Sequence, residues 1–265
     1  MTNNETEESF MIRKFLMILL VFITVFTVSF ADGLKLTDDA ADVRVYLYDE
    51  LQPDGPSYTY SYCYPCIDDS EACAAEINSF YSYIIDDTLN FANPMMVDDL
   101  HSYGIETSSR EDISYTLCCN NGEYFSILIK KHSFIDGYED LIYEGHTFLT
   151  GGGHPGSTVA LPYLLGLLES NNNDTWLQDR QTQKAESFTR ELVWESIMEK
   201  ADAGDLVLYE EIDEDFLTDN FYPEEDFYLD ENGDPVFFIQ PGRIADLSYG
   251  LIEIPISLDT LYDEF

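Results

Sequence analysis

Five cysteines are the residues whose types and spacing most directly suggest chemistry, either disulfide formation or metal binding. They are Cys63, Cys66, Cys73, Cys118 and Cys119. Two cysteines separated by two residues are half of a typical structural zinc site, which usually has a second pair with similar spacing. Here the last two cysteines are adjacent on an expected strand, so they point to opposite faces. We therefore expect no metal ion and favour disulfides, which form in oxidising compartments and leave one of the five thiols free or paired between molecules.

The positions of the cysteines favour two particular bonds. Cys66 and Cys73 lie close in sequence at an expected strand-to-helix junction, so a bond between them closes a short loop. Cys63 could then pair with Cys118 or Cys119 across neighbouring strands. Connectivity cannot be deduced from sequence alone, so the partner of Cys63 stays open.

Histidines and carboxylates form no readable catalytic motif. The sequence has no G-x-S-x-G nucleophile elbow, no H-E-x-x-H zinc motif and no phosphate-binding glycine loop before a helix. The four histidines are too widely spaced for a metal motif; they are His101, His132, His146 and His154. Paired carboxylates could hydrolyse a glycosidic bond, but 52 acidic residues make some close pair inevitable. We expect neither catalytic residues nor a cofactor, and the alternative is a secreted glycan hydrolase or deacetylase-type enzyme.

A glycine-rich loop provides the candidate contact for a partner. Its residues are Gly151, Gly152, Gly153, His154, Pro155 and Gly156. Such a run can be neither a helix nor a central strand, and loops often carry binding residues. We therefore take Gly152, Gly153, His154 and Pro155 as candidate partner-binding residues. The alternative is that the glycines simply allow a sharp turn, with the imidazole packing or capping nearby.

The charge of the chain is strongly acidic. It has 12 Lys and Arg against 52 Asp and Glu, a formal net charge of −40 and a pI near 4.1. A surface of this sign repels phosphate backbones and anionic lipid headgroups, so nucleic acid and membrane surfaces are excluded as electrostatic partners. Two interpretations remain: the acidity keeps a secreted protein soluble, or it attracts a basic partner.

Residues 1–31 resemble a signal peptide. Arg13 and Lys14 precede an apolar stretch over residues 15–30, and Ala31 completes a small-residue cleavage site. The alternative is a retained membrane anchor, but the apolar stretch would form a helix of about 24 Å, shorter than a hydrocarbon core of about 30 Å. We expect cleavage after Ala31, a secreted or cell-envelope protein, and no membrane span in the mature chain.

Hydrophobic periodicity predicts two β-rich units that position these residues. In the first unit, residues 32–150, we expect a helix over 69–90 that ends before Pro94, an Asn121-Gly122 hairpin turn, and strands over 43–48, 57–64, 113–119, 124–130 and 140–149. In the second, residues 151–265, we expect an apolar run over 161–168, a helix over 182–203, acidic loop-rich sequence, and strands over 226–229, 235–239 and 251–256. The fold class is therefore α+β, with two units that each hold an antiparallel sheet and one long helix.

Three segments carry a family resemblance. The first is Tyr64-Pro65 followed by Ala75–Asn78; the second joins residues 113–116, 124–127 and the loop 152–155; the third joins residues 227–229, 235–238, Gly250 and 254–256. In this order, over about residues 40–265, they resemble the extracellular region of RsiV-type anti-sigma factors. That region recurs as the non-catalytic part of some peptidoglycan deacetylases and in stand-alone exported proteins.

The resemblance implies binding rather than catalysis. In the best understood members the exported region senses lysozyme by direct contact, and an intracellular segment restrains a sigma factor. The stretch before Arg13 is too short for a sigma-binding domain, and no segment resembles a deacetylase. The expectation is a stand-alone exported module that recognises a basic muramidase such as lysozyme, or a cell-wall component.

Overall fold

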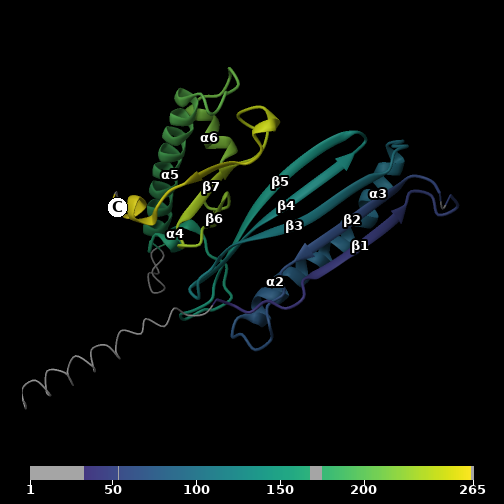
Figure 1. The fold of residues 1–265 in the computed structure, drawn as a ribbon, viewed down its shortest axis with the longest axis horizontal. Coiled ribbons are helices and arrows are strands. Elements are labelled where there is room, and N and C mark those ends of the chain that lie inside the picture. Colours follow the sequence, from purple (N-terminus) through teal and green to yellow (C-terminus); the bar gives the residue numbers. More distant parts are fainter. Residues whose placement is uncertain (1–32, 53, 168–174, 264–265) are drawn as a thin grey trace, which may run out of the picture. The chain divides into compact units, whose positions relative to one another are not determined.

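Two β-sheets with helices packed on them make up the part of the chain that the computed structural model describes, residues 33–52, 54–167 and 175–263 (Figure 1). Gly33–Phe265 forms one compact unit. Among the described residues no helix is both long and apolar enough to cross a membrane. The expected signal peptide, residues 1–31, lies outside the described part. The expected α+β fold class is confirmed.

The larger sheet has five strands arranged in sequence order. They are β1 (Ala40–Leu47), β2 (Ser57–Tyr64), β3 (Ser109–Asn120), β4 (Tyr124–Ile135) and β5 (Tyr138–Leu149). The expected Asn121-Gly122 turn joins β3 to β4, and Gly122 has the positive φ of 83° that suits such a turn. The strands thus follow the sequence-based expectation closely, although β1, β3, β4 and β5 are longer than predicted.

One pair of strands in this sheet departs from the expected antiparallel arrangement. Neighbouring strands are antiparallel at three of the four pairings, but β2 and β3 are parallel. The expectation of a purely antiparallel sheet is therefore wrong at this pair. The cause is the helical connection between β2 and β3, which returns the chain to the end of the sheet where β2 began, as parallel strands require.

Helices between β2 and β3 lie along one face of the larger sheet (Figure 1). Helix α2 (Ala74–Asp87) runs through a short π-helical segment, η1 (Thr88–Ala92), into α3 (Asn93–Ser102). The predicted helix over 69–90 is confirmed in its centre, but it begins later and the chain stays helical beyond Pro94. Pro94 is the second residue of α3, directly after the π-helical segment, and does not end the helical path.

Alternation along β2 explains why these helices pack where they do. Tyr58, Tyr60 and Tyr64 lie at every second or fourth position, so they point to the same face. All three are buried, together with Ile77 and Tyr81 of α2. The rings of Tyr64 and Tyr81 stack with centroids 5.3 Å apart. This aromatic contact between β2 and α2 is the centre of the first hydrophobic core.

The smaller sheet and the longest helix form the second hydrophobic core. The sheet holds β6 (Phe227–Leu229), β7 (Pro235–Ile239) and β8 (Ile252–Pro255), all antiparallel. Helix α5 (Thr175–Ala203) covers it, with Val193 and Ile197 buried against Phe237 and Ile254. Shorter helices are α4 (Leu161–Leu164), α6 (Glu214–Asn220) and α7 (Leu258–Asp263), and η2 (Leu247–Tyr249) is a 3-10 turn.

The two sheets make direct contact along β6. The Leu229 N–H donates to Ser126 Oγ at 2.9 Å, and that hydroxyl lies 2.8 Å from the Thr147 hydroxyl. A Cβ atom added at Gly145 of β5 would overlap the carbonyl oxygen of Phe227. Glycine at 145 therefore lets the backbones of β5 and β6 approach more closely than any side chain would permit.

Candidate partner-binding site

The glycine loop forms an exposed turn that follows β5. Gly152 has a φ of 77° and Gly156 one of 87°, a region that favours glycine. The Gly156 N–H donates to the Leu149 carbonyl at 2.7 Å, and the Leu149 N–H donates to the Ser157 carbonyl at 2.9 Å. Of the predicted contact residues, Gly152, Gly153 and His154 are exposed and Pro155 is half-buried. The structure thus holds the four predicted residues together on one turn, accessible to a partner.

Two acidic residues from other elements, Glu76 and Glu123, lie beside this loop. A Cβ atom added at the buried Gly156 would come within 2.5 Å of Glu76 Cβ on α2. On the other side, the Thr150 N–H donates to the carbonyl of Glu123 in the β3–β4 turn at 2.9 Å. The loop is therefore fixed between α2 and this turn, in the neighbourhood of two carboxylates. No sequence signal links these residues, because the contacts arise from packing.

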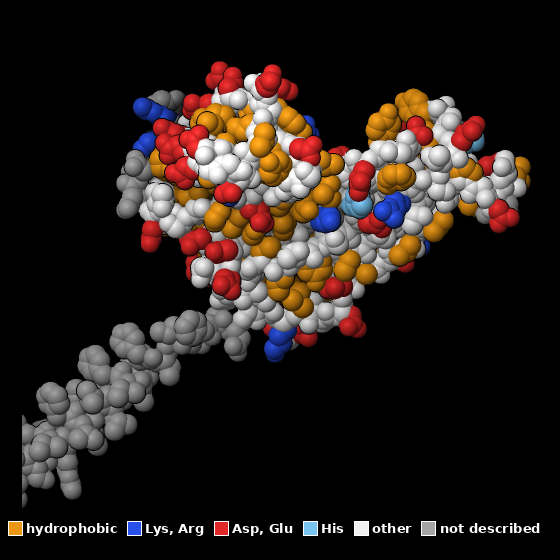
Figure 2. All heavy atoms as spheres, turned by 45° about the horizontal axis from the view of Figure 1, so that its top comes forward, with side chains coloured by type: hydrophobic (Ala, Val, Ile, Leu, Met, Phe, Trp, Pro, Cys, Tyr) orange, Lys and Arg blue, Asp and Glu red, His pale blue; other side chains and the backbone are white. Residues whose placement is uncertain are grey.

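A strongly acidic segment extends from the end of α5 to just beyond β7. From Ala201 to Gly242 the sequence has 14 Asp and Glu residues and no Lys or Arg. The segment runs from the end of α5 through a loop, the helix α6 and the strands β6 and β7. Asp213 caps the first turn of α6 by accepting a hydrogen bond from Phe216 N–H at 3.2 Å. Figure 2 shows carboxylates over much of the visible face and a dense group of them on the side that holds α5 and α6. The expectation of loop structure is wrong for residues 214–220, which form α6; Asp213 is the capping signal in the sequence.

A carboxyl pair on α5 and the loop before β6 has unusual electrostatics. Arg190 Nη1 lies 3.6 Å from Glu186 Oε2, and its Nε donates to the Phe221 carbonyl at 3.4 Å. A hydrogen bond with Glu186, aided by partial burial, raises the pKa of Glu224 to about 7. Glu224 is therefore still partly protonated at neutral pH and shares that proton with Glu186 through the hydrogen bond, which ties the loop to α5.

The shared proton predicts a pH dependence of stability that Glu224→Gln should weaken. Because the pKa of Glu224 is raised from 4.5 to about 7 in the folded protein, the folded state retains a proton that the unfolded chain has released. Its stabilising contribution is complete below pH 4.5 and is lost as the pH rises through 7. Thermal midpoints measured between pH 5 and 8 should fall less in the variant than in the wild type. Glu186→Gln removes the neighbouring negative charge that helps to raise the pKa of Glu224, and it should have the same effect; if both variants keep the wild-type slope, no proton is shared.

The five cysteines are all free in the structure. Cys73 and Cys119 are buried, and Cys63, Cys66 and Cys118 are half-buried. Burial raises the pKa of both Cys118 and Cys119 to about 11, so these two thiols stay protonated at neutral pH and are poor nucleophiles. The expected bonds, Cys66 with Cys73 and Cys63 with Cys118 or Cys119, are not formed, and they stay predictions for the oxidised protein.

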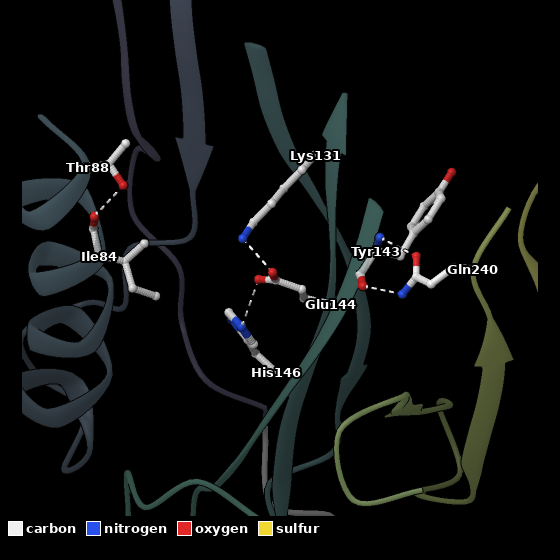
Figure 3. A network of polar contacts seen from close by, with 7 residues as sticks. All are labelled: Ile84, Thr88, Lys131, Tyr143, Glu144, His146 and Gln240. Atoms are coloured by element: carbon white, nitrogen blue, oxygen red, sulfur yellow. Dashed lines mark hydrogen bonds and ion pairs between the residues drawn. The ribbon is translucent and has the colours of Figure 1, made fainter. Parts of the chain in front are cut away.

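Figure 3 shows a polar network on β4 and β5 that includes His146. Lys131 Nζ lies 2.5 Å from Glu144 Oε1, and His146 Nε2 lies 3.8 Å from Glu144 Oε2. Burial lowers the pKa of His146 to about 4, and its ring meets the Phe80 ring edge-to-face at 5.3 Å. The imidazole is therefore neutral and packs between the sheet and α2. Within the described ranges, no group of three or more His, Cys, Asp or Glu side chains is placed to hold a metal ion.

A separate pair of polar contacts lies at the outer edge of β5. The Tyr143 N–H donates to Gln240 Oε1 at 2.9 Å, and Gln240 Nε2 donates back to the Tyr143 carbonyl at 2.8 Å (Figure 3). Gln240 directly follows β7. This amide pairing adds a second link between the larger sheet and the smaller one.

These features define an α+β protein with a five-stranded and a three-stranded sheet and a strongly acidic C-terminal half. Residues 177–259, from α5 to the start of α7, match the family described as "Protein of unknown function (DUF3298)". The acidic segment and all of the smaller sheet lie within this match. A comparison with curated proteins found no match.

Two solved structures of DUF3298 proteins align with most of this chain. A DUF3298 family protein from Pseudomonas aeruginosa is 12% identical, and the alignment covers 88% of this chain and 94% of that one with a TM-score of 0.50. A member of the same family from Bacteroides fragilis is 13% identical, with 87% and 93% covered and a TM-score of 0.46. At such identity the likeness to the Pseudomonas protein is one of fold. The resemblance noted in the sequence is thus supported as far as a DUF3298 domain.

Proposed function

We propose that this protein is an exported binding module, similar to the extracellular region of RsiV-type anti-sigma factors, that recognises a cationic muramidase of the lysozyme type. A cell-wall component is the other ligand class that the resemblance suggests. Binding, rather than catalysis, is the role that the surface supports. Export rests on Arg13, Lys14, the apolar residues 15–30 and Ala31.

The observation that carries the proposal is the acidic segment between Ala201 and Gly242. Its 14 carboxylates are accompanied by no Lys or Arg in that stretch, and most of those around α6 are exposed. A concentrated field of one sign raises the association rate of an oppositely charged protein by about 10-fold to 1000-fold. An acidity that served solubility alone would need no such concentration. The exposed glycine loop, with Glu76 and Glu123 beside it, offers a second acidic contact.

Association with lysozyme, measured with purified residues 33–265 at low and moderate salt, tests this proposal. Steering by exposed charge predicts an association rate that falls as salt rises, because charges are screened beyond about 8 Å at physiological ionic strength. A packed interface should keep dissociation slow at both salt concentrations. Cytochrome c, another strongly basic protein, is the control for attraction by charge alone. Retention of both proteins, or of neither, at moderate salt contradicts the proposal.

A matched pair of variants locates the steering charge. The first neutralises four exposed acids around α6 and the second neutralises four exposed acids on α2 and α3. The substitutions are Glu210→Gln, Glu211→Gln, Glu214→Gln and Asp219→Asn in the first, and Asp86→Asn, Asp87→Asn, Asp98→Asn and Asp99→Asn in the second. We expect the first variant to slow association about tenfold at low salt and the second to slow it much less. Equal slowing would show that only the net charge matters.

A further inference from the structure

The strand β8 has an open edge. Among the described residues it pairs with β7 and with no other strand. The Ile256 N–H donates to the Pro235 carbonyl at 3.1 Å, and Ile254 is registered with Phe237. Because backbone groups alternate along an antiparallel strand, the N–H and C=O of Glu253 and the C=O of Pro255 point away from β7. Proline at this position is consistent with that direction, since it has no N–H to donate.

A groove lies between this strand and α5. Two adjoining hollows, with volumes of about 320 and 210 Å³, share Ser196, Glu199 and Pro255 in their walls. The α5 wall runs from Leu192 to Ala203. Eleven residue steps on a helix span about 16 Å, which equals the length of about five residues of extended chain. The groove therefore has the length of a short β-strand, with α5 along one side and Ile254, Pro255 and Ile256 along the other.

The negative charge of the groove favours a basic ligand over an acidic one. Glu195, Glu199 and Asp205 line it, against one cationic side chain, Lys200. An extended segment that carries lysine or arginine at alternate positions would place those side chains on one face, toward the carboxylates of α5. An acidic segment would meet repulsion at the same positions.

We propose that the groove between α5 and β8 accepts an extended cationic segment of a partner protein, which adds to β8 as a fourth strand of the smaller sheet. Main-chain hydrogen bonds to Glu253 and Pro255 supply affinity, and the carboxylates of α5 supply selectivity for basic side chains, as in other cases of β-strand addition. This inference rests on the proposed function, which supplies a basic protein as the partner. It adds the place where one segment of that partner would bind.

The test uses fluorescence anisotropy of a labelled, capped six-residue peptide that alternates lysine with threonine, added to purified residues 33–265. Two analogues carry N-methyl groups, one on the lysine backbone nitrogens and one on the threonine nitrogens. They keep the charge, but each has lost the donors along one edge of the strand. We expect the parent peptide to bind and at least one analogue to bind at least tenfold more weakly. Failure of the parent to bind, or equal binding of all three peptides, overturns the proposal.

Variants separate the groove from the rest of the acidic surface. Ser196→Trp fills the shared wall of the two hollows, and Glu195→Gln with Glu199→Gln removes their charge; both should weaken peptide binding at least tenfold. Glu191→Gln with Glu106→Gln removes the same charge from exposed positions outside both the groove and the acidic segment and should change binding less than threefold. Thermal midpoints confirm that each variant is folded, and equal effects of the two charge pairs contradict the proposal.

Lysozyme binding by Ser196→Trp distinguishes this inference from the proposed function. If Ser196→Trp loses the peptide and also releases lysozyme faster, the groove is part of the partner's interface. If lysozyme binding is unchanged, the groove proposal fails while the proposed function stands. If the wild type binds the peptide but not lysozyme, the proposed partner is wrong and the groove remains.

Discussion

Gly145→Ala is expected to lower the free energy of unfolding by about 3 kcal/mol, the upper part of the range for overpacking in a closely packed interior. The added methyl group would overlap the Phe227 carbonyl, which is backbone and cannot rotate away. Relief requires β6 to move from β5, and that movement also strains the 2.9 Å bond from Leu229 N–H to Ser126 Oγ. Both sheets should lose stability together, because β6 connects them.

Gly153→Ala is the matched control for this prediction. Gly153 lies in the exposed loop, where a Cβ atom would have no neighbour within 4 Å. The same chemical change should therefore alter the free energy of unfolding by less than about 0.5 kcal/mol, as at an ordinary surface position. Urea unfolding of both variants, followed by circular dichroism and by tyrosine fluorescence, measures the difference. Similar stability of the two variants would show that β6 does not lie against β5.

Local patterns were sufficient to predict most of the strands. The alternating tyrosines of β2 and the Asn121-Gly122 turn carry their own signals, because side chains alternate in strands and Asn-Gly suits a tight hairpin turn. The Asp136-Gly137 turn joins β4 to β5 with φ values of 51° and 82°. That dipeptide is also a hairpin signal. It indicates that β4 continues to the residue before the turn and that β5 begins directly after it.

Features that depend on tertiary packing could not be read from local sequence. Helix α3 begins where Pro94 was expected to mark the end of helical structure, and the burial of Val97 and Leu100 under the sheet stabilises it. The parallel pairing of β2 with β3 follows from the path of the intervening helices. Propensity is a weak guide where such packing decides.

The candidate functional residues also fall into two groups: those that a local pattern predicts and those that only folding brings together. The glycine loop was visible in the sequence because an exposed turn needs glycine at 152 and 156. The Glu186–Glu224 pair was not, since its partners are on α5 and on the loop before β6, and only folding brings them together. The α5–β8 groove likewise needs the order of strands in the smaller sheet, which no local pattern specifies.

The buried imidazole of His146 is expected to make the protein lose about 3 kcal/mol of stability on acidification. Burial lowers its pKa from 6.5 to about 4, and each pKa unit corresponds to about 1.4 kcal/mol. Between these two values the unfolded chain binds a proton that the folded protein does not. The contribution of His146 is therefore complete above pH 6.5 and is lost as the pH falls to about 4.

Two substitutions at His146 test this without relying on a single packing change. His146→Phe keeps a ring beside Phe80, and His146→Gln keeps a polar group near Glu144, but neither can titrate. Urea unfolding at intervals from pH 4 to 7.5 gives the free energy of unfolding for each protein. Titration of the many carboxylates is common to all three, so the wild type minus either variant should show a difference that falls by about 3 kcal/mol between pH 6.5 and 4. If that difference is independent of pH for both substitutions, the imidazole is accessible to protons in the folded protein and does not seal the contact between α2 and the sheet.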